Sequence, residues 1–193
     1  MRIEVLVLWV SALCPALAGA EPLFQPEPAP DHSYDGGWEH YVGGGLAVFD
    51  CDGDHRPDLY AAGGENPAQL LRNGSEPGGE LVFTPDTPEA LSLTGVIGAY
   101  PLDIDSDGHQ DLAILRVGEN LLLRGLGACN FEAFAPEGFD GGDRWTTAFS
   151  ATWEQGQDLP TLAFGNYVDR DDPDGPFGAC DENQLLRPEG QSY

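Results

Sequence analysis

Positive charge is scarce in this sequence. The chain has no lysine, and its 8 basic residues, all arginine, stand against 33 aspartates and glutamates, giving a formal net charge of −25. Nucleic acid recognition needs clustered positive charge, and the field of this chain repels polyanions. We therefore expect no nucleic acid partner and no attraction to anionic membrane surfaces.

Long helix-compatible stretches are lacking as well. The chain has 26 glycines and 16 prolines, residues that break helix interiors. Hydrophobic residues still make up 41 % of it, including 9 Phe, 6 Tyr and 4 Trp, so wholesale disorder is not expected. The composition favours a turn-rich, acidic, all-β protein.

The N-terminus has the pattern of an export signal. Arg2 precedes an apolar stretch over residues 3–13, and Ala18, Gly19 and Ala20 form a small-residue cleavage pattern. The apolar stretch is shorter than the about 20 residues that a membrane span needs. We expect residues 1–20 to be a signal peptide cleaved near Ala20, and the mature protein to be secreted, extracellular or periplasmic, with no membrane span. A buried N-terminal strand is the alternative.

Cysteine is infrequent, and Cys14, one of 4 cysteines, lies in the expected signal peptide. In an oxidising compartment Cys51, Cys129 and Cys180 can form one disulfide and leave one thiol over. Cys129 and Cys180 both follow a Gly-Ala dipeptide, and this similarity favours them as the pair. The spacing of cysteines and histidines does not predict a zinc site.

A repeat organises the rest of the chain. Residues 21–40 form a Pro-rich, acidic lead-in, and related units follow at about residues 41–94, 95–144 and 145–193. Each unit predicts four short strands, in the first at residues 46–49, 59–62, 69–72 and 81–84. A β-sandwich also has short strands, but a motif repeated in register favours β-propeller blades of four antiparallel strands, about three of them here.

Two acidic loops contain the residues that indicate a function most specifically. Each places aspartates at positions 1, 3, 5 and 9, and a backbone carbonyl at position 7 can complete a shell of oxygens. The first loop offers Asp50, Asp52, Asp54, Arg56 and Asp58, and the second offers Asp103, Asp105, Asp107, His109 and Asp111. Oxygen ligands in this number suit Ca²⁺ better than Mg²⁺, so about two Ca²⁺ sites are expected. Solvated acidic turns are the alternative, although carboxylates at this density repel one another without a cation.

Three details bound this interpretation. An EF-hand does not fit, because its position 12 requires glutamate where these loops have Ala61 and Ile114. In the first loop His55 replaces the glycine of position 6, where a positive φ is often needed. The third unit has lost the site, since its aligned positions are Trp153, Gln155, Gln157 and Thr161. Its insertion, with Asp169, Asp171, Asp172 and Asp174, is expected to be a solvated loop.

The two loops resemble the FG-GAP/VCBS-type repeats of integrin-α-like propellers and of many secreted bacterial proteins. The motif Asp-x-Asp-x-Asp-Gly-x-x-Asp-Leu is complete over residues 103–112 and nearly complete over 50–59. Residues 165–187 resemble the cartilage-acidic-protein/ASPIC type more loosely. The resemblance covers about residues 41–190 and implies a Ca²⁺-stiffened propeller, usually seven-bladed, with metal loops on one face and partner or glycan recognition commonly on the other.

The resemblance implies no single activity, because such repeats serve many functions. Three units are also fewer than the 4–8 blades that close a propeller. We therefore expect an N-terminal portion of a longer protein, with blades supplied by other chains as the alternative.

Nothing in the sequence indicates catalysis, since it has no Gly-x-Ser-x-Gly, HExxH or phosphate-loop motif. We expect a secreted Ca²⁺-binding interaction or adhesion module rather than an enzyme, with an extracellular protein or glycan as its partner. The alternatives are the non-catalytic portion of a larger secreted polysaccharide lyase or hydrolase, and a purely structural array.

Overall fold

The chain folds into antiparallel β-strands, as its composition predicts. The structure is a computed structural model that describes residues 26–175 and 178–193, so the expected signal peptide lies outside the described residues. Two short 3-10 turns, η1 (Trp38–His40) and η2 (Glu89–Leu91), accompany the strands. The strands are β1 (Leu46–Phe49), β2 (Asp58–Ala61), β3 (Gln69–Asn73), β4 (Phe83–Pro85), β5 (Val96–Leu102), β6 (Asp111–Glu119), β7 (Leu121–Gly125), β8 (Phe131–Phe134), β9 (Asp143–Thr152), β10 (Thr161–Asn166) and β11 (Gln184–Leu186).

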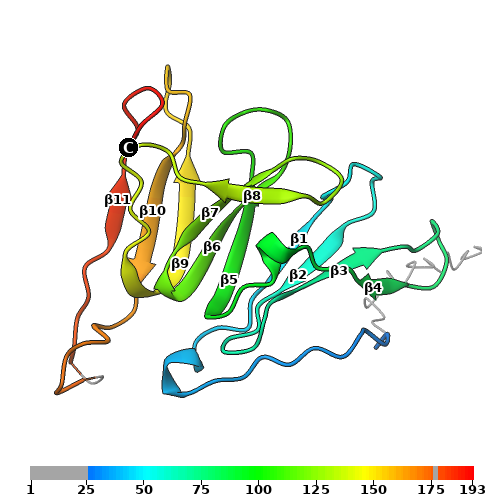
Figure 1. The fold of residues 1–193 in the computed structure, drawn as a ribbon, viewed down its shortest axis with the longest axis horizontal. Helices are drawn as coiled ribbons and strands as arrows, with labels where there is room; N and C mark the ends of the chain where they lie inside the picture. The colour runs from blue at the N-terminus through cyan, green and yellow to red at the C-terminus, as the bar shows by residue number, and fades with distance from the viewer. Residues whose placement is uncertain (1–25, 176–177) are drawn as a thin grey trace, which may run out of the picture.

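The strands form three meanders that stand side by side (Figure 1). The first is a four-stranded sheet in the order β1-β2-β3-β4, and β5, β6, β7 and β8 pair in the same order in the second. In the third, β10 pairs with β9 on one side and β11 on the other. These repeated antiparallel sheets confirm the predicted all-β fold of blade-like units. Three of the four strands predicted in the first unit start within one residue of their expected position.

Backbone hydrogen bonds join the second sheet to the third, a connection that the prediction of separate four-stranded blades does not include. Strand β6 has nine residues, and its last three, Val117 to Glu119, extend beyond β7 and pair with the start of β9. An isolated bridge between Gly64 and Val96 joins the first two sheets at the corresponding point. Adjacent units are therefore joined through the backbone at one end.

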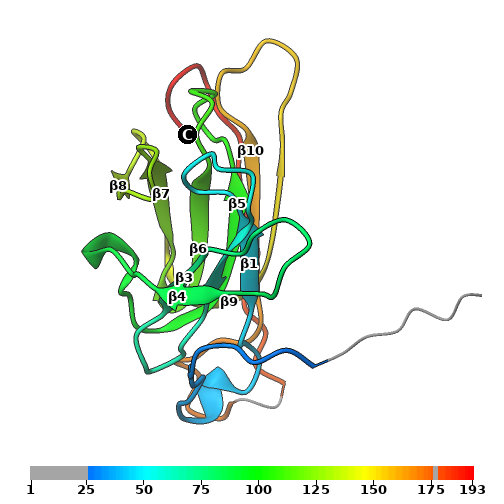
Figure 2. The same cartoon turned by 90° about the vertical axis from the view of Figure 1, so that its right-hand side faces the viewer.

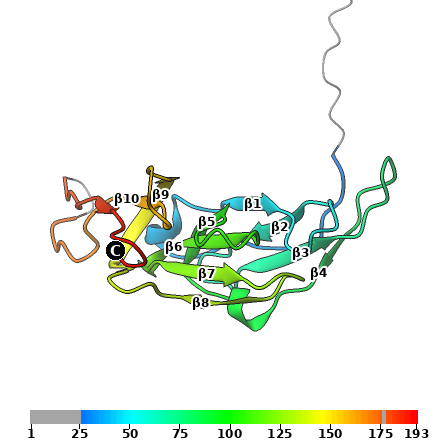
Figure 3. The same ribbon diagram turned by 90° about the horizontal axis from the view of Figure 1, so that it is seen from above.

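The core consists of two apolar layers, one on each face of the second sheet. Leu112 and Ile114 of β6 pack against the first sheet, while Ala113 and Leu115 pack against the third. Side chains alternate across a strand, so one run of apolar residues can serve both layers. Seen from above, β5 lies between β1 and β9, and each sheet extends away from these first strands (Figure 3).

The described part of the acidic lead-in, from residue 26 onward, runs to the end of the sheets opposite the aspartate loops and is docked there (Figure 2). The Asp35 N–H donates to the Gly63 carbonyl at 3.2 Å, and the Glu65 N–H donates to the Asp35 carbonyl at 2.9 Å. Further along, Arg170 pairs with Glu39, with Nε and Oε1 2.8 Å apart. The lead-in thus connects the first sheet to the third. No helix within residues 26–175 and 178–193 has the length and apolar character to cross a membrane.

The expected disulfide between Cys129 and Cys180 is wrong. Cys51 pairs with Cys129, their Cα atoms 4.7 Å apart, and Cys180 is exposed and bonded to no other cysteine among the described residues. The Cys129 N–H also donates to the Cys51 carbonyl at 2.9 Å, which holds the β7–β8 turn against the first loop. The similar contexts indicated the wrong pair because they stand at different places in the fold: Cys129 lies in the turn between β7 and β8, the third and fourth strands of the second sheet, whereas Cys180 lies between β10 and β11, the second and third strands of the third sheet.

Candidate metal centre

Both aspartate loops connect the first strand of a sheet to its second strand. They lie at the same end of the molecule, as does the corresponding loop between β9 and β10 (Figure 2). The position 9 residues, Asp58 and Asp111, are the first residues of β2 and β6, so a strand fixes the end of each loop.

The aspartate at position 1 organises each loop by accepting backbone N–H groups. Asp50 accepts from Gly53 at 2.8 Å, Asp54 at 3.2 Å and His55 at 2.8 Å. Burial raises the pKa of Asp50, but these backbone donors outweigh it and hold the pKa below its usual range. Its counterpart Asp103 accepts from Asp107 and Gly108, both at 3.1 Å. Both loops therefore fix this carboxylate in place, and the first loop also favours the ionised form of Asp50.

Each loop has two residues with left-handed backbone, at positions 4 and 6. These are Gly53 (φ 78°) and His55 (φ 66°) in the first loop, and Ser106 (φ 61°) and Gly108 (φ 89°) in the second. Each loop thus has glycine at one of the two positions and a residue with a side chain at the other. His55 adopts the positive φ despite replacing glycine, so the first loop has the same backbone path as the second.

The aspartate at position 9 is buried and tied to two backbone N–H groups. Asp58 accepts from Cys51 at 3.2 Å and from Asn73 at 2.8 Å, and Asp111 accepts from Ile104 and Gly125, both at 2.7 Å. Burial raises the pKa of Asp111; its two backbone donors oppose this shift, whereas the neighbouring carboxylates Asp105 and Asp107 add to it. A cation beside these groups would offset that cost.

The carboxylates of positions 1, 3 and 9 converge in both loops. One ligand atom each from Asp50, Asp52 and Asp58 lies within 4.8 Å of the others, and the same holds for Asp103, Asp105 and Asp111. The remaining predicted residues stand outside these two groups. Asp54 accepts the Arg56 N–H at 2.8 Å, and Asp107 accepts the His109 N–H at 2.8 Å.

This donor set fits a divalent cation that prefers hard oxygen ligands. Ca²⁺ takes 6–8 oxygens in a flexible geometry, and three convergent carboxylates supply part of such a shell. Two unit charges about 4 Å apart near a protein surface repel by roughly 4 kcal/mol, so three carboxylates in one group need positive charge nearby. In this fold Asp50, Asp52 and Asp58, and likewise Asp103, Asp105 and Asp111, are the residues that would hold the ion.

Two arginines that the sequence motif does not include face the two groups. Arg72, in β3, pairs with Asp52 and lies 3.4 Å from Asp58, measured from Nε to Oδ1. Arg124, in β7, lies 2.6 Å from Asp105, measured from Nε to Oδ2, and its guanidinium lies over the Phe134 ring. Both arginines belong to a repeated Leu-Leu-Arg segment. The recurrence of this segment, with Arg187 in the third unit, is the signal in the sequence that could have indicated these arginines.

The third loop replaces the carboxylate group with a single ion pair. Arg187 follows β11 and pairs with Glu154, with Nε and Oε1 2.8 Å apart. The hydroxyl of Thr161, at the place of Asp58 and Asp111, donates to Glu154 at 2.7 Å. The hydrogen bonds from Arg187 and Thr161 lower the pKa of Glu154. Among the described residues, no group of three possible metal ligands includes this loop.

The acidic insertion makes local turns of its own. Asp169 accepts the Asp171 N–H at 2.9 Å, and Asp172 accepts the Asp174 N–H at 2.8 Å. The insertion lies at the end of the third sheet away from the aspartate loops (Figure 1). In the described part of the chain, its carboxylates form no group that could hold a metal ion.

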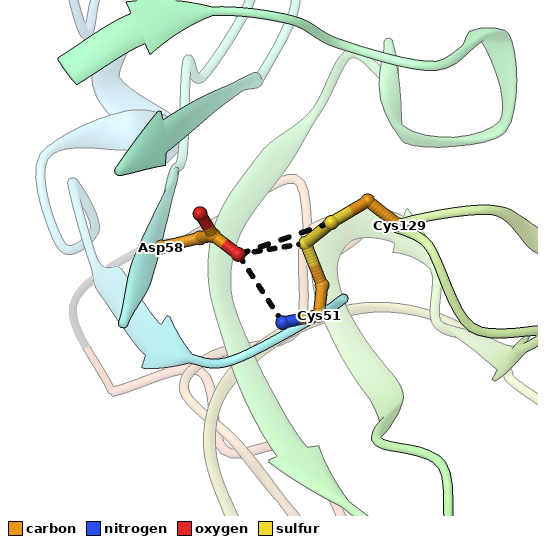
Figure 4. A group of neighbouring side chains, drawn as sticks. All are labelled: Cys51, Asp58 and Cys129. Carbon is orange, nitrogen blue, oxygen red and sulfur yellow. Dashed lines mark hydrogen bonds between the residues drawn. A yellow bond between two sulfur atoms is a disulfide. The ribbon is translucent and has the colours of Figure 1, made fainter. Parts of the chain in front are cut away.

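The disulfide lies directly beside the first group (Figure 4). Asp58 Oδ2 is 2.9 Å from Cys51 Sγ and 3.8 Å from Cys129 Sγ. A disulfide sulfur has no proton to donate, so these are packing contacts, and the Cys51 N–H is the donor that Asp58 uses here. Cys51 occupies position 2 of its loop, where the second loop has the buried Ile104.

This fold and site define a class of protein: an antiparallel β-repeat with an aspartate loop between the first two strands of its sheets. Residues 50–114 match the family model of the FG-GAP-like repeat, from the first aspartate of the first loop into β6. This segment of the chain is therefore similar to the FG-GAP-like repeat, in agreement with the resemblance of the loop motif. A search of curated proteins gives no match to the chain.

Proposed function

We propose that this protein is a secreted, Ca²⁺-binding module of the FG-GAP/VCBS type, related to the cartilage-acidic-protein/ASPIC branch, that binds an extracellular protein or glycan without catalysing a reaction. One observation carries the metal part of the proposal: the same three-carboxylate group is built twice, 53 residues apart, on the same backbone path. A solvated acidic turn has no reason to recur in this form.

The charge at the two loops supports the choice of a divalent cation. In the second loop one arginine faces four aspartates, whereas in the third loop one arginine faces one glutamate and balances it. Among the described residues, convergent groups of three carboxylates occur only in the loops that carry the motif. Oxygen donors alone, with no nitrogen or sulfur available in the second group, favour Ca²⁺ over transition metals.

A binding role is supported by apolar surface on the first strands of the sheets. Leu46 and Val48 of β1 are 62 % and 57 % exposed, and they line a concave surface together with Tyr41 and Tyr100. Exposed apolar patches on soluble proteins commonly mark interaction sites. The disulfide between Cys51 and Cys129 supports an oxidising, extracellular setting.

Thermal unfolding in chelator and in millimolar Ca²⁺, with Mg²⁺ as the control ion, tests the metal part. Each site should add about 2.7 kcal/mol when Ca²⁺ is at 100 times its Kd, which raises the Tm by about 5–10 °C. Asp105→Ala should remove most of the contribution of the second site. Asp172→Ala, in the acidic insertion, is the matched control and should leave the Ca²⁺ response unchanged.

Two outcomes would contradict the proposal. A cooperative melt that does not respond to Ca²⁺ would leave the loops as solvated turns. Equal damage from Asp172→Ala and Asp105→Ala would show that the ligands are assigned to the wrong residues.

A further inference from the structure

Each of the three sheets places one arginine at the same point, at or just beyond its third strand. These are Arg72, Arg124 and Arg187, and each guanidinium pairs with an acidic side chain of the loop between the first and second strands. Three independent copies of one contact indicate a common role for the residue. In the two aspartate loops, the acidic partner is the position 3 carboxylate, Asp52 or Asp105.

We infer that Arg72 and Arg124 are internal counter-cations that occupy the position 3 carboxylate of an ion-free loop and thereby set the affinity of the loop for Ca²⁺. This inference rests on the proposed Ca²⁺ binding. The position 3 carboxylate belongs to the convergent group of its loop, so the arginine and the metal ion compete for the same oxygens. A guanidinium at this distance also repels a divalent cation.

The structure gives both arginines a second carboxylate to pair with. Arg124 Nη1 is 3.8 Å from Glu132 on β8, and Arg72 Nη1 is 3.8 Å from Asp86 after β4. Glu132 and Asp86, the outer partners of the two arginines, are more exposed than the position 3 aspartates. When Ca²⁺ takes Asp105 or Asp52, the guanidinium can shift to this outer partner and keep an ion pair.

The third loop shows the other limit of the same arrangement. Its position 9 residue is Thr161 instead of aspartate, and Glu154, the carboxylate that Arg187 faces, also accepts the Thr161 hydroxyl. Among the described residues, the Arg187 guanidinium is the positive charge that pairs with this loop. In the third loop, therefore, Arg187 neutralises the one carboxylate that it faces. In the second loop, Arg124 pairs with Asp105 and leaves the other aspartates of the loop without a positive partner in the described part of the chain.

Calorimetric Ca²⁺ titration of the purified chain and of Arg124→Gln tests this inference. Removing the competing charge should lower the Kd of the second site by about 3- to 10-fold, the equivalent of a partly exposed ion pair. The same variant should melt at a lower temperature in chelator, because the ion-free loop loses its counter-charge. Arg124→Lys, which keeps the charge, should stay close to the wild-type Kd.

Two further variants make the test specific. Glu132→Gln removes the outer partner and should raise the Kd, whereas Glu137→Gln removes an exposed carboxylate of the next turn that pairs with no arginine in the described residues. Arg187→Gln should lower the Tm equally in chelator and in Ca²⁺ and leave the Kd unchanged.

The outcomes separate this inference from the proposed function. If the wild-type chain binds Ca²⁺ and Arg124→Gln binds it no more tightly, the inference is wrong and the proposed function stands. If neither protein binds Ca²⁺, both are wrong. Binding by Arg124→Gln alone would support the inference in its strongest form.

Discussion

The first and second aspartate loops have the same geometry but are attached to the neighbouring sheet in different ways. In both loops the carboxylates of positions 1, 3 and 9 lie close together, and positions 4 and 6 have a left-handed backbone. At position 2, however, the first loop has Cys51, bonded to Cys129 in the second sheet, while the second loop has Ile104, fully buried between the second and third sheets. The two loops therefore share the arrangement of their carboxylates and differ in the position 2 residue, which packs against the neighbouring sheet.

This difference shows what position 2 does. It is the residue of the loop that faces the next sheet, so it fixes the loop to its neighbour by whatever chemistry is available. Its backbone N–H also donates to the position 9 aspartate in both loops, at 3.2 Å from Cys51 and 2.7 Å from Ile104. Fastening the loop and placing the buried carboxylate are therefore coupled.

Breaking the covalent fastening should have the largest effect. The disulfide closes a segment of 78 residues, and a chain-entropy estimate for that length is about 4.5 kcal/mol of unfolding free energy. We expect Cys51→Ser with Cys129→Ser to lose most of this in urea unfolding with chelator, and to weaken Ca²⁺ at the first loop more than at the second. Cys180→Ser is the control and should change neither quantity. Equal weakening at both loops would mean that the disulfide stabilises the whole chain without fastening its own loop.

Removing a buried aspartate should come next. Asp111→Ala leaves the N–H groups of Ile104 and Gly125 without an acceptor, at about 1–3 kcal/mol each. We expect a loss of about 3 kcal/mol in urea unfolding with chelator, before any metal is added. Asp107→Ala, in the same loop but exposed and outside the convergent group, should cost little in chelator. Similar losses from both variants in chelator would show that burial of the Asp111 carboxylate does not set its structural importance.

Part of this comparison is visible in the sequence alone. Aspartates at alternate positions predict the local path of the loop, and short apolar runs on either side predict the flanking strands. Residues 46–49 therefore form a strand as predicted, and residues 50–58 and 103–111 form equivalent loops. Local patterns of this kind depend on neighbours in the chain.

The rest depends on which sheet faces which. Cys51 meets Cys129 because the first loop lies against the β7–β8 turn, a relation between two different sheets that no local context encodes. The pairing of Arg72 with Asp52 likewise joins β3 to the loop between β1 and β2, and the repeated Leu-Leu-Arg segment does not by itself identify the acidic partner of its arginine. The docking of the lead-in against the first and third sheets also follows from their arrangement.

The smallest expected effect concerns the two left-handed positions, where the loops exchange glycine for a side chain. A residue with a Cβ pays about 1–2 kcal/mol for left-handed backbone, and glycine gives back about 0.5–1 kcal/mol through its greater freedom in the unfolded chain. His55→Gly should therefore stabilise the protein by up to about 1 kcal/mol in chelator, and Ser106→Gly should do the same. His109→Gly is the control, because His109 does not have a positive φ, and it should destabilise instead. The His55 ring is almost fully exposed and its Nδ1 is 3.9 Å from Asp50 Oδ2, too far for a hydrogen bond, so little is lost with it. If His55→Gly destabilised the protein while Ser106→Gly stabilised it, the His55 side chain would have to support Asp50, and the two loops would differ in their polar side as well as in their fastening.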